Sequence, residues 1–342
     1  MKHKTTAAEV ARAAGVGTAT VDRVLNGRGG VSADKQRLVI ECARKLGLDR
    51  NLDYRPSRIL RIGVLMQEPG NPFYETLQRT FHRANELYFG QSIQISQWYY
   101  SLKKLPEAAQ LLEKIAKSID GLIVVLPDHD ATNAALKRVA EKIPVITMAS
   151  DLAYSGRLAY IGVDNRMAGR TAADLMGRLI GKEGGDIAIV TGLQSFVDQG
   201  QREIGFRATL AQRHPLCRVV SVLEARDQAE LAGTMVANTL HAFPDIRGIY
   251  NLAAGDQEIV RAVQNAKTTE RVIIITHELT PDRRRLLKEG ALDAVIDQNP
   301  EHEAMVAVRA MANHFGRMTK EVGNDSDATR TEIRIFMREN CL

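Results

Sequence analysis

The sequence of 342 residues is poor in several features that would define a class of protein. It has three cysteines, Cys42, Cys217 and Cys341. Their number is odd and they lie far apart in the sequence, which excludes a disulfide framework and matches no spacing of metal ligands. No apolar run approaches the roughly 20 residues that cross a bilayer, and the first residues contain no secretory segment. We therefore expect reduced thiols and a cytoplasmic protein that does not contact a membrane.

Signatures of common catalytic chemistries are also missing. The sequence has no Gly-x-Ser-x-Gly, no His-Glu-x-x-His and no phosphate-binding loop. Glu301-His302-Glu303 has the composition of a metal cluster, but it follows Pro300, which favours the first turn of a helix. A glycosidase with paired carboxylates is not excluded by spacing alone. We expect that the protein binds no metal and no cofactor and that it is not an enzyme.

The positive charge is concentrated at one end of the chain. Residues 1–61 contain 13 Lys and Arg against 6 Asp and Glu, whereas the remaining residues contain 33 against 35. A basic segment on a near-neutral body indicates binding to nucleic acid, with an affinity that falls steeply as salt is added. A solvated basic face without a partner is the alternative.

The same segment has the pattern of a helix-turn-helix unit. Thr6 followed by Glu9 predicts a capped first helix, Gly15 allows a tight turn, and Val21 anchors a second helix over about 18–26. A third helix is expected next, with inward side chains at Leu38, Val39, Cys42 and Leu46. The second helix would present its outer face to a major groove of DNA.

From Arg61 onward, short apolar runs alternate with amphipathic helical segments. The alternation predicts parallel sheets with helices on both faces, and so many strands suit two lobes better than one sheet. The runs expected as strands are 62–66, 93–98, 122–126, 145–148, 160–163, 187–191, 219–223, 248–250, 272–275 and 294–296. After a polar, mobile segment, residues 331–337 alternate apolar and polar and predict a final strand.

Side chains that bind hydroxyl groups follow many of these strands, where ligands bind in folds of this kind. Asn71 stands before Phe73 and Tyr74, and an amide beside two aromatic rings suits a sugar. Core positions are the alternative for the two rings, and a helix cap is the alternative for Asp164. Further polar side chains after later strands are Asp164, Arg202, Asn251, Glu278 and Gln298.

The basic head resembles the LacI/GalR family of bacterial transcription regulators along EVARAAGVGTATVDRVLNGRGGVSADKQRLVIECARKLG. The resemblance implies that Arg23 faces the bases, where its planar fork suits guanine O6 and N7; a phosphate contact is the alternative. Family members carry Ser or His where this chain has Asp22, which could read a cytosine amino group. The residues expected to bind DNA are Thr18, Ala19, Thr20, Asp22, Arg23, Asn26, Arg28 and Arg55.

The segment after the head departs from this family. The family pattern has a short hinge helix after a Tyr-x-Pro-Asn sequence, with a leucine that wedges into the minor groove. Here Tyr54-Arg55-Pro56-Ser57 runs almost directly into the first predicted strand. We therefore expect the hinge helix to be absent or shortened and the bending of DNA to be small.

The body resembles the type I periplasmic sugar-binding fold of the ribose-binding kind, which also forms the effector domain of LacI/GalR regulators. NPFY, RxxGF, THELTPD and IDQNP match the ligand-binding segments of that fold. The Asp-Arg pair of many sugar binders is replaced by Ala149-Ser150-Asp151, so ribose is not transferred as the ligand. The residues expected to bind the ligand are Asn71, Phe73, Tyr74, Ser150, Asp151, Asp164, Arg202, Asn251, Glu278 and Gln298.

Together these features predict an all-α helix-turn-helix head followed by a two-lobed α/β periplasmic-binding-protein-like domain with parallel sheets. The expected organisation is a head at 1–48, a linker at 49–60, a ligand-binding domain at 61–318 and a final segment at 319–342. The predicted function is a homodimeric transcription regulator, and repression is the family's commoner mode. Its affinity for operator DNA would change when a small sugar or polyol binds. A transporter's sugar-binding protein or a sugar-modifying enzyme is the alternative, although neither needs a basic head.

Overall fold

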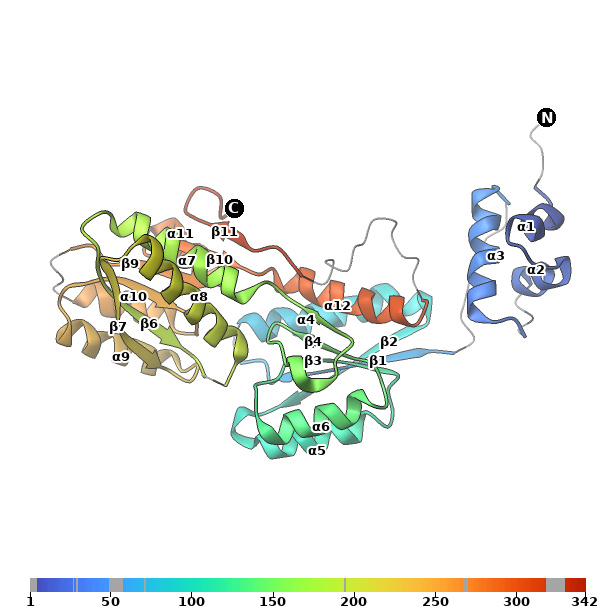
Figure 1. Cartoon of the computed structure of the whole chain (residues 1–342), viewed down its shortest axis with the longest axis horizontal. Coiled ribbons are helices and arrows are strands. Elements are labelled where there is room, and N and C mark those ends of the chain that lie inside the picture. Colours follow the sequence, from blue (N-terminus) through green and yellow to red (C-terminus); the bar gives the residue numbers. More distant parts are fainter. Residues whose placement is uncertain are drawn as a thin grey trace.

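A computed structural model describes residues 5–26, 28, 30–48, 58–70, 72–193, 195–266, 268, 270–317 and 330–342. Its first three helices are α1 (Ala7–Ala13), α2 (Thr18–Leu25) and α3 (Ala33–Lys45) (Figure 1). Thr6 and Glu9 form the expected capping box, and Gly15 turns the chain at a φ of 61°. The helices share a small core of Val10, Ala11, Ala14, Val21, Val39 and Ala43.

The inner face of α3 differs from the expectation. Leu38 and Leu46 were expected to point inward, but they are 43% and 41% exposed. Val39 and Ala43, four residues apart, set the inner face, and Leu38 lies about 100° around the helix from Val39. Leu46 follows the last residue of the helix, so the helical period no longer places it.

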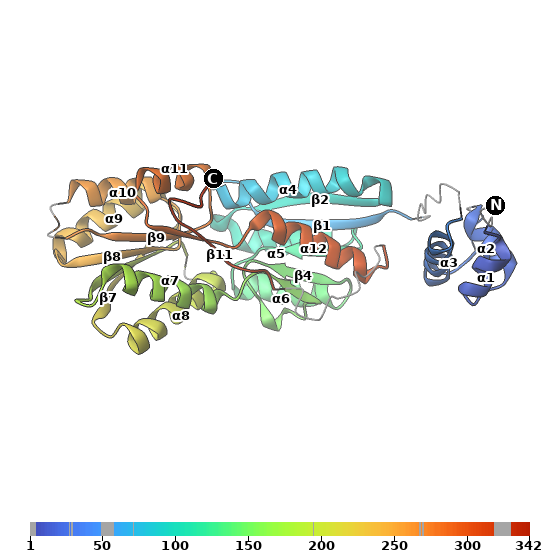
Figure 2. The same ribbon diagram turned by 90° about the horizontal axis from the view of Figure 1, so that it is seen from above.

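The body consists of two lobes, each with a sheet between helices (Figures 1 and 2). The first lobe has five parallel strands in the order β2-β1-β3-β4-β5. Both β3 and β4 are buried along their whole length, as strands covered on both faces must be. The strands are β1 (Leu60–Gln67), β2 (Ile93–Tyr100), β3 (Gly121–Val124), β4 (Val145–Met148) and β5 (Ala159–Ile161).

Helices cover both faces of the first sheet. On one face α4 (Pro72–Tyr88) and α12 (Pro300–His314) bury Phe81 and Val308 against the strands. On the other face α5 (Leu105–Ile115) and α6 (Asp130–Ala140) do the same with an independent apolar cluster. Three short 3-10 helices lie in the connections at Phe89–Gln91, Leu102–Lys104 and Ala153–Ser155.

The second lobe has six strands in the order β11-β10-β9-β8-β6-β7. All neighbours are parallel except β11 (Arg334–Phe336), which pairs antiparallel with β10 and is shorter than the predicted strand. One face packs on α7 (Asn165–Ile180) and α8 (Val197–Arg213). The other face packs on α9 (Ala229–Ala242), α10 (Asp256–Asn265) and α11 (Pro281–Glu289). The remaining strands are β6 (Gly185–Thr191), β7 (Cys217–Glu224), β8 (Ile246–Asn251), β9 (Ile273–His277) and β10 (Ala294–Asp297).

The chain passes between the lobes three times. It leaves the first lobe after β5, returns after β10 to form α12, and re-enters the second lobe before β11. Two of these crossings lie side by side, because Gly162 bridges Arg330 and its carbonyl accepts a hydrogen bond from the Thr331 amide at 3.1 Å. A few residues of extended chain therefore join two bodies that each have their own core, a geometry that permits hinge motion.

The observed architecture confirms the predicted fold class. Each of the ten apolar runs expected as strands coincides with one of β1–β10. The segment 300–314 is a helix that begins at the Asn299 cap, so Glu301-His302-Glu303 lies in its first turn. Most of the predicted linker and of the segment expected to be mobile lie outside the described residues, as does Arg55. No helix of the described chain is long and apolar enough to cross a membrane.

Candidate functional site: a polar pocket between the lobes

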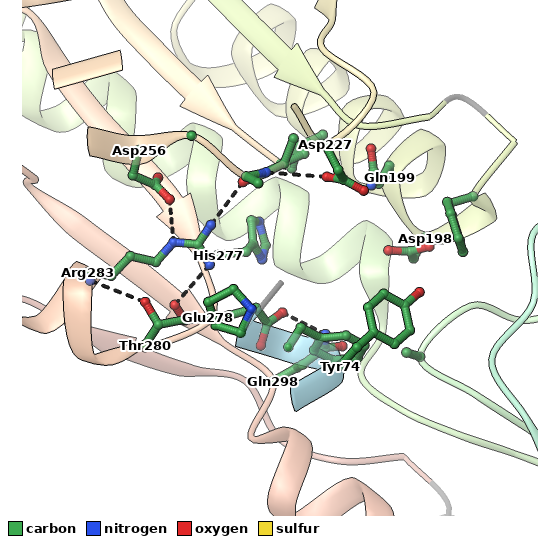
Figure 3. A pocket seen from close by; sticks show the side chains of 18 of the residues that line it. Tyr74, Asp198, Gln199, Asp227, Asp256, His277, Glu278, Thr280, Arg283 and Gln298 are labelled. Carbon is green, nitrogen blue, oxygen red and sulfur yellow. Dashed lines mark hydrogen bonds and ion pairs between the residues drawn. The ribbon is translucent and has the colours of Figure 1, made fainter. Parts of the chain in front are cut away.

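A cavity of about 250 Å³ lies where the two lobes face each other (Figure 3). A cavity of this size accommodates a small organic molecule. The first lobe contributes Phe73, Tyr74 and Ser150, and the second contributes the larger, polar share. That share includes Asp198, Gln199, Arg202, Asp227, His277, Glu278, Arg283 and Gln298.

Strained backbone surrounds this cavity. Ala149, Asp227 and Glu278 line the cavity and have φ angles of 60°, 54° and 65°. These angles lie in the left-handed region, which residues other than glycine rarely adopt. Each stands at or just after the carboxyl end of β4, β7 or β9. Conformations of this kind cost about 1–3 kcal/mol each and persist where the surrounding structure holds a functional group in place.

Arg202 is the central cation of the site. It projects from α8, is only 3% exposed, and its Nε donates to Asn165 Oδ1 at 2.8 Å. One terminal nitrogen donates to Gln298 Oε1 at 3.4 Å and lies 3.9 Å from Asp198 Oδ2. Burial lowers the pKa of Arg202, but the carboxylates of Asp198 and Glu278 outweigh burial and raise it, so the guanidinium stays charged.

Glu278 is a buried acid with one oxygen left open. Its Oε1 accepts a hydrogen bond of 2.6 Å from the side-chain amide of Gln298, whereas its Oε2 has no partner. Burial, followed by the nearby charge of Asp297, raises the pKa of Glu278 to about 8. A buried carboxyl oxygen without a hydrogen-bond partner is costly, so its place in a residue that lines the cavity indicates that a ligand forms a hydrogen bond with it.

Asp198 and Asp227 are two further acids of the cavity wall. Asp198 lies in the first turn of α8, and its Oδ1 has no hydrogen-bond partner. Asp227 follows β7 and accepts a hydrogen bond of 3.3 Å from the Ala254 amide. Burial raises the pKa of each carboxyl group, and the charge of Asp198 raises that of Asp227 further. The cavity is therefore rich in acceptors.

Two further polar side chains that line the cavity, Arg283 and His277, form hydrogen bonds within the protein. Arg283 donates from Nε to Asp256 Oδ2 at 2.6 Å and from its two terminal nitrogens to the carbonyls of Ala253 and Glu278. His277 lies 2.7 Å from the Tyr250 hydroxyl, and burial, with Arg202 and Arg283 nearby, puts its pKa well below the usual range. The imidazole is thus neutral, and the guanidinium of Arg283 fixes the loops that end β8 and β9.

The predicted ligand contacts divide into two groups. The structure brings Phe73, Tyr74, Ser150, Arg202, Glu278 and Gln298 together around the cavity. Asp151 instead forms a bidentate pair with Arg157, Asp164 caps α7 by accepting from the Met167 amide, and Asn251 binds Asp256 and its own loop. The cap that was the alternative for Asp164 is thus present, and Asn71 lies outside the described residues.

The outer face of α2 presents the groups that the sequence assigns to DNA. Thr18, Ala19 and Arg23 are exposed there, while Val21 is buried in the core of the three helices. Asp22 accepts from Asn26 at 2.6 Å and from Arg28 at 3.1 Å, so its carboxylate orients two polar side chains beside the helix. Thr20 is half-buried.

The geometry defines a three-helix unit with an exposed polar helix, joined to a two-lobed body that encloses a polar cavity. A model of bacterial regulatory proteins of the lacI family matches residues 6–57, and a periplasmic binding protein domain matches residues 62–317. The chain therefore combines a DNA-binding domain of the lacI family of bacterial regulatory proteins with a periplasmic binding protein domain, which forms its body. It is a ligand-responsive, DNA-binding transcription regulator.

Relatives and solved structures agree with both parts of this assignment. Ribose import binding protein RbsB of Salmonella typhimurium is 25% identical over 244 residues, which cover 70% of this chain and 79% of RbsB. The ribose operon repressor of Halalkalibacterium halodurans is 25% identical over 255 residues, covering 72% of this chain and 71% of that repressor. GanP, a glucose-galactose binding protein from Geobacillus stearothermophilus, has a TM-score of 0.72 at 22% identity and covers 83% of this chain and 99% of its own, a likeness of fold.

Proposed function

We propose that the effector is a small sugar or polyol that binds in the cavity between the lobes and changes the affinity of a homodimer for operator DNA. The observation that carries this proposal is the unpartnered oxygen Glu278 Oε2, buried in a residue that lines a cavity between both lobes. A hydroxyl group can donate and accept, so it suits this oxygen whether the carboxyl group is ionised or protonated. The repressors and binding proteins similar to this chain, whose names refer to ribose, glucose and galactose, support the same class.

Each lobe has a distinct part in the proposed binding. Phe73 and Tyr74, whose rings meet edge to face at 5.1 Å, offer apolar surface to the C–H faces of a ring, and Ser150 lies beside them. Arg202 and Gln298 donate to ligand oxygens from the second lobe, and Glu278 accepts from ligand hydroxyls. Asn71 remains a proposed contact on the strength of the NPFY sequence alone.

Binding would alter DNA affinity because closure of the lobes moves the start of the body. Arg58, just before β1, pairs with Asp120 at 2.6 Å, and its carbonyl accepts from Arg317 just beyond α12. At its other end α12 begins beside Gln298, a residue of the cavity. The helix thus spans the distance from the ligand site to the linker. A coupling of about 1–3 kcal/mol, typical of allosteric regulators, would change operator affinity about 5–150-fold.

For the DNA contact we propose the exposed face of α2, with Arg23 as the base-reading residue. Two heads are needed because one short helix makes few contacts, and a homodimer suits the two half-sites of a palindromic operator. Arg28 and Asn26, held by Asp22, and Arg55 in the linker would contact phosphates. We propose repression as the mode, the cytoplasm as the location where DNA is met, and no catalytic activity.

A binding experiment on the full-length protein tests the ligand proposal. Thermal shift and titration calorimetry with a panel of pentoses, hexoses and polyols should identify a compound that binds the wild type, and R202Q should lose most of that affinity. The matched control is R207Q, because Arg207 lies on the same helix but is solvent-facing and paired with Glu203. F73A, from the other lobe, should also weaken binding, while its circular dichroism spectrum should match that of the wild type.

Two outcomes would contradict these proposals. Ligand binding that neither R202Q nor F73A weakens would contradict the proposed site. Turnover of any compound of the panel would contradict the proposed absence of catalysis.

A further inference from the structure

The inner wall of the cavity has more negative than positive charge. Three acids, Asp198, Asp227 and Glu278, point into it from α8, from the loop after β7 and from the end of β9 (Figure 3). Two arginines act on these acids: Arg202, at 3.9 Å from Asp198 and within electrostatic reach of Glu278, and Arg283, whose own charge is matched by Asp256. Because the pKa of Glu278 is about 8, this acid is ionised at neutral pH only when a cation binds beside it; with all three acids ionised, the described inner wall has an excess of two negative charges.

The other charged groups around the opening already have opposite charges nearby. Arg283 is committed to Asp256 at 2.6 Å, and both side chains are about nine-tenths buried. Glu258 and Asp282 lie at the rim, with arginines of their own helices at 3.9 Å and 3.8 Å. His277 is neutral. Arg283 does lower the pKa of Asp227 and of Glu278, but its charge is matched by Asp256, so the charged groups described around the cavity still have more negative than positive charge.

Two of the three acids also have hydrogen-bonding capacity that the described protein does not use. Glu278 Oε2 and Asp198 Oδ1 have no partner, and Glu278 is only 8% exposed. Asp227 and Glu278 are held in left-handed backbone conformations, which cost free energy to maintain. The pKa of each acid is raised by burial, as expected where nearby positive charge is insufficient to offset the loss of water. A neutral sugar would satisfy hydrogen bonds but would leave this charge uncompensated.

We propose that the effector carries a protonated amine in addition to its hydroxyl groups, so that an ammonium group binds among Asp198, Asp227 and Glu278. The ligand class is then an amino sugar or amino polyol, an inference that rests on the sugar site proposed above. An ammonium group offers three donors and one positive charge, and it suits an unpartnered carboxylate oxygen such as that of Asp198 or Glu278. A bare metal ion does not suit the site, because no three acidic, histidine or cysteine side chains of the described chain come close enough to hold one.

Matched pairs of compounds test this proposal on the full-length protein. Calorimetry at pH 7 compares D-glucosamine with D-glucose, D-galactosamine with D-galactose, and D-glucamine with D-sorbitol, each at equal ionic strength. In at least one pair the amine should bind tenfold or more tightly than its hydroxyl partner. N-acetylation of the preferred amine, which removes its charge, should abolish that advantage.

A variant pair shows whether the preference comes from these acids. D198N should lower the ratio of amine to hydroxyl affinity severalfold, whereas E203Q, one turn further along α8 and outside the cavity, should leave the ratio unchanged. If the uncharged member of every pair binds equally well or more tightly, the proposed ammonium group is refuted, while the proposed sugar site is retained. If no compound binds, the proposed ammonium group is refuted and the proposed sugar site loses its support as well. An amine preference that D198N leaves intact, and that D227N and E278Q also leave intact, would refute its assignment to the three acids.

Discussion

Replacing Glu278 by glutamine should make the ligand-free protein more stable at neutral pH. In the folded protein the pKa of Glu278 is about 8, against an ordinary value of 4.5. Between pH 4.5 and pH 8, Glu278 is protonated in the folded protein but ionised in the unfolded chain. Ionisation in the unfolded chain therefore lowers the free energy of unfolding as the pH rises. At pH 7 the penalty is at most about 3 kcal/mol, since each pKa unit is worth about 1.36 kcal/mol. Because Glu278 sits among other charges, we expect about 2 kcal/mol to be recovered by E278Q.

The sign of the effect sets its pH dependence. Below pH 4.5 the acid is protonated in both states, so wild type and E278Q should have nearly equal stability. The advantage of E278Q should grow from there to pH 8 and then stay constant, because the raised pKa destabilises the folded wild type only where the unfolded chain is ionised. At about 2–4 °C of melting temperature for each kcal/mol, the shift should be about 4–8 °C at pH 7 and larger at pH 8.

Calorimetric melting of the empty protein at pH 5, 6, 7 and 8 measures this shift. Glutamine retains an oxygen that can accept the 2.6 Å hydrogen bond from Gln298, so the packing of the site is kept. E203Q is the control, because its exposed pair with Arg207 should be worth less than about 1 kcal/mol at any pH. A melting difference that is the same at pH 5 and pH 8, or a loss of stability at pH 8, would refute the reasoning.

Three further predictions concern the head, the hinge and the linker. R23A should weaken operator binding by about 1–3 kcal/mol and relax specificity at one base pair, measured by anisotropy on a set of single-substitution operators; unchanged affinity would remove Arg23 from base reading. E303Q should stabilise the protein at neutral pH, for the reason given for Glu278, because burial raises the pKa of Glu303 and the amide can keep the Thr331 hydrogen bond; E303A should instead cost about 2–4 kcal/mol in chemical unfolding. D120A, which frees Arg58, should reduce the effect of ligand on DNA affinity without changing ligand affinity; an unaltered effect would show that this ion pair does not transmit the signal.

The sequence predicts the strands of this protein well because both lobes bury parallel strands on two faces. Strands such as β3 and β4 are continuous apolar runs, and the polar residues on either side of a run indicate where the strand begins and ends. The carboxyl ends then locate Glu278 and Gln298, which stand directly after β9 and β10. The left-handed φ of Glu278 has no signal in the sequence, because the conformation is imposed by the packed loop rather than by local preference.

Other parts of the site depend on pairings that spacing does not reveal. Asp151 follows β4 as a ligand-binding acid would, but Arg157 lies close in the folded loop and binds both of its carboxylate oxygens. Asp198 was missed because it lies on a helix rather than after a strand. Its position four residues before Arg202 on one helix face was the available signal. Asp227 was also missed, although its place shortly after the predicted strand 219–223 was the available signal.

The most direct test of the central claim is anisotropy of the full-length protein on DNA from upstream of its own gene, with and without a compound shown to bind the cavity. The account predicts tight, salt-sensitive binding that the compound shifts about 5–150-fold, and a shift that R202Q loses while R207Q keeps it. Operator affinity that is the same with and without a compound that binds the cavity would contradict the claim that this pocket controls the DNA-binding head.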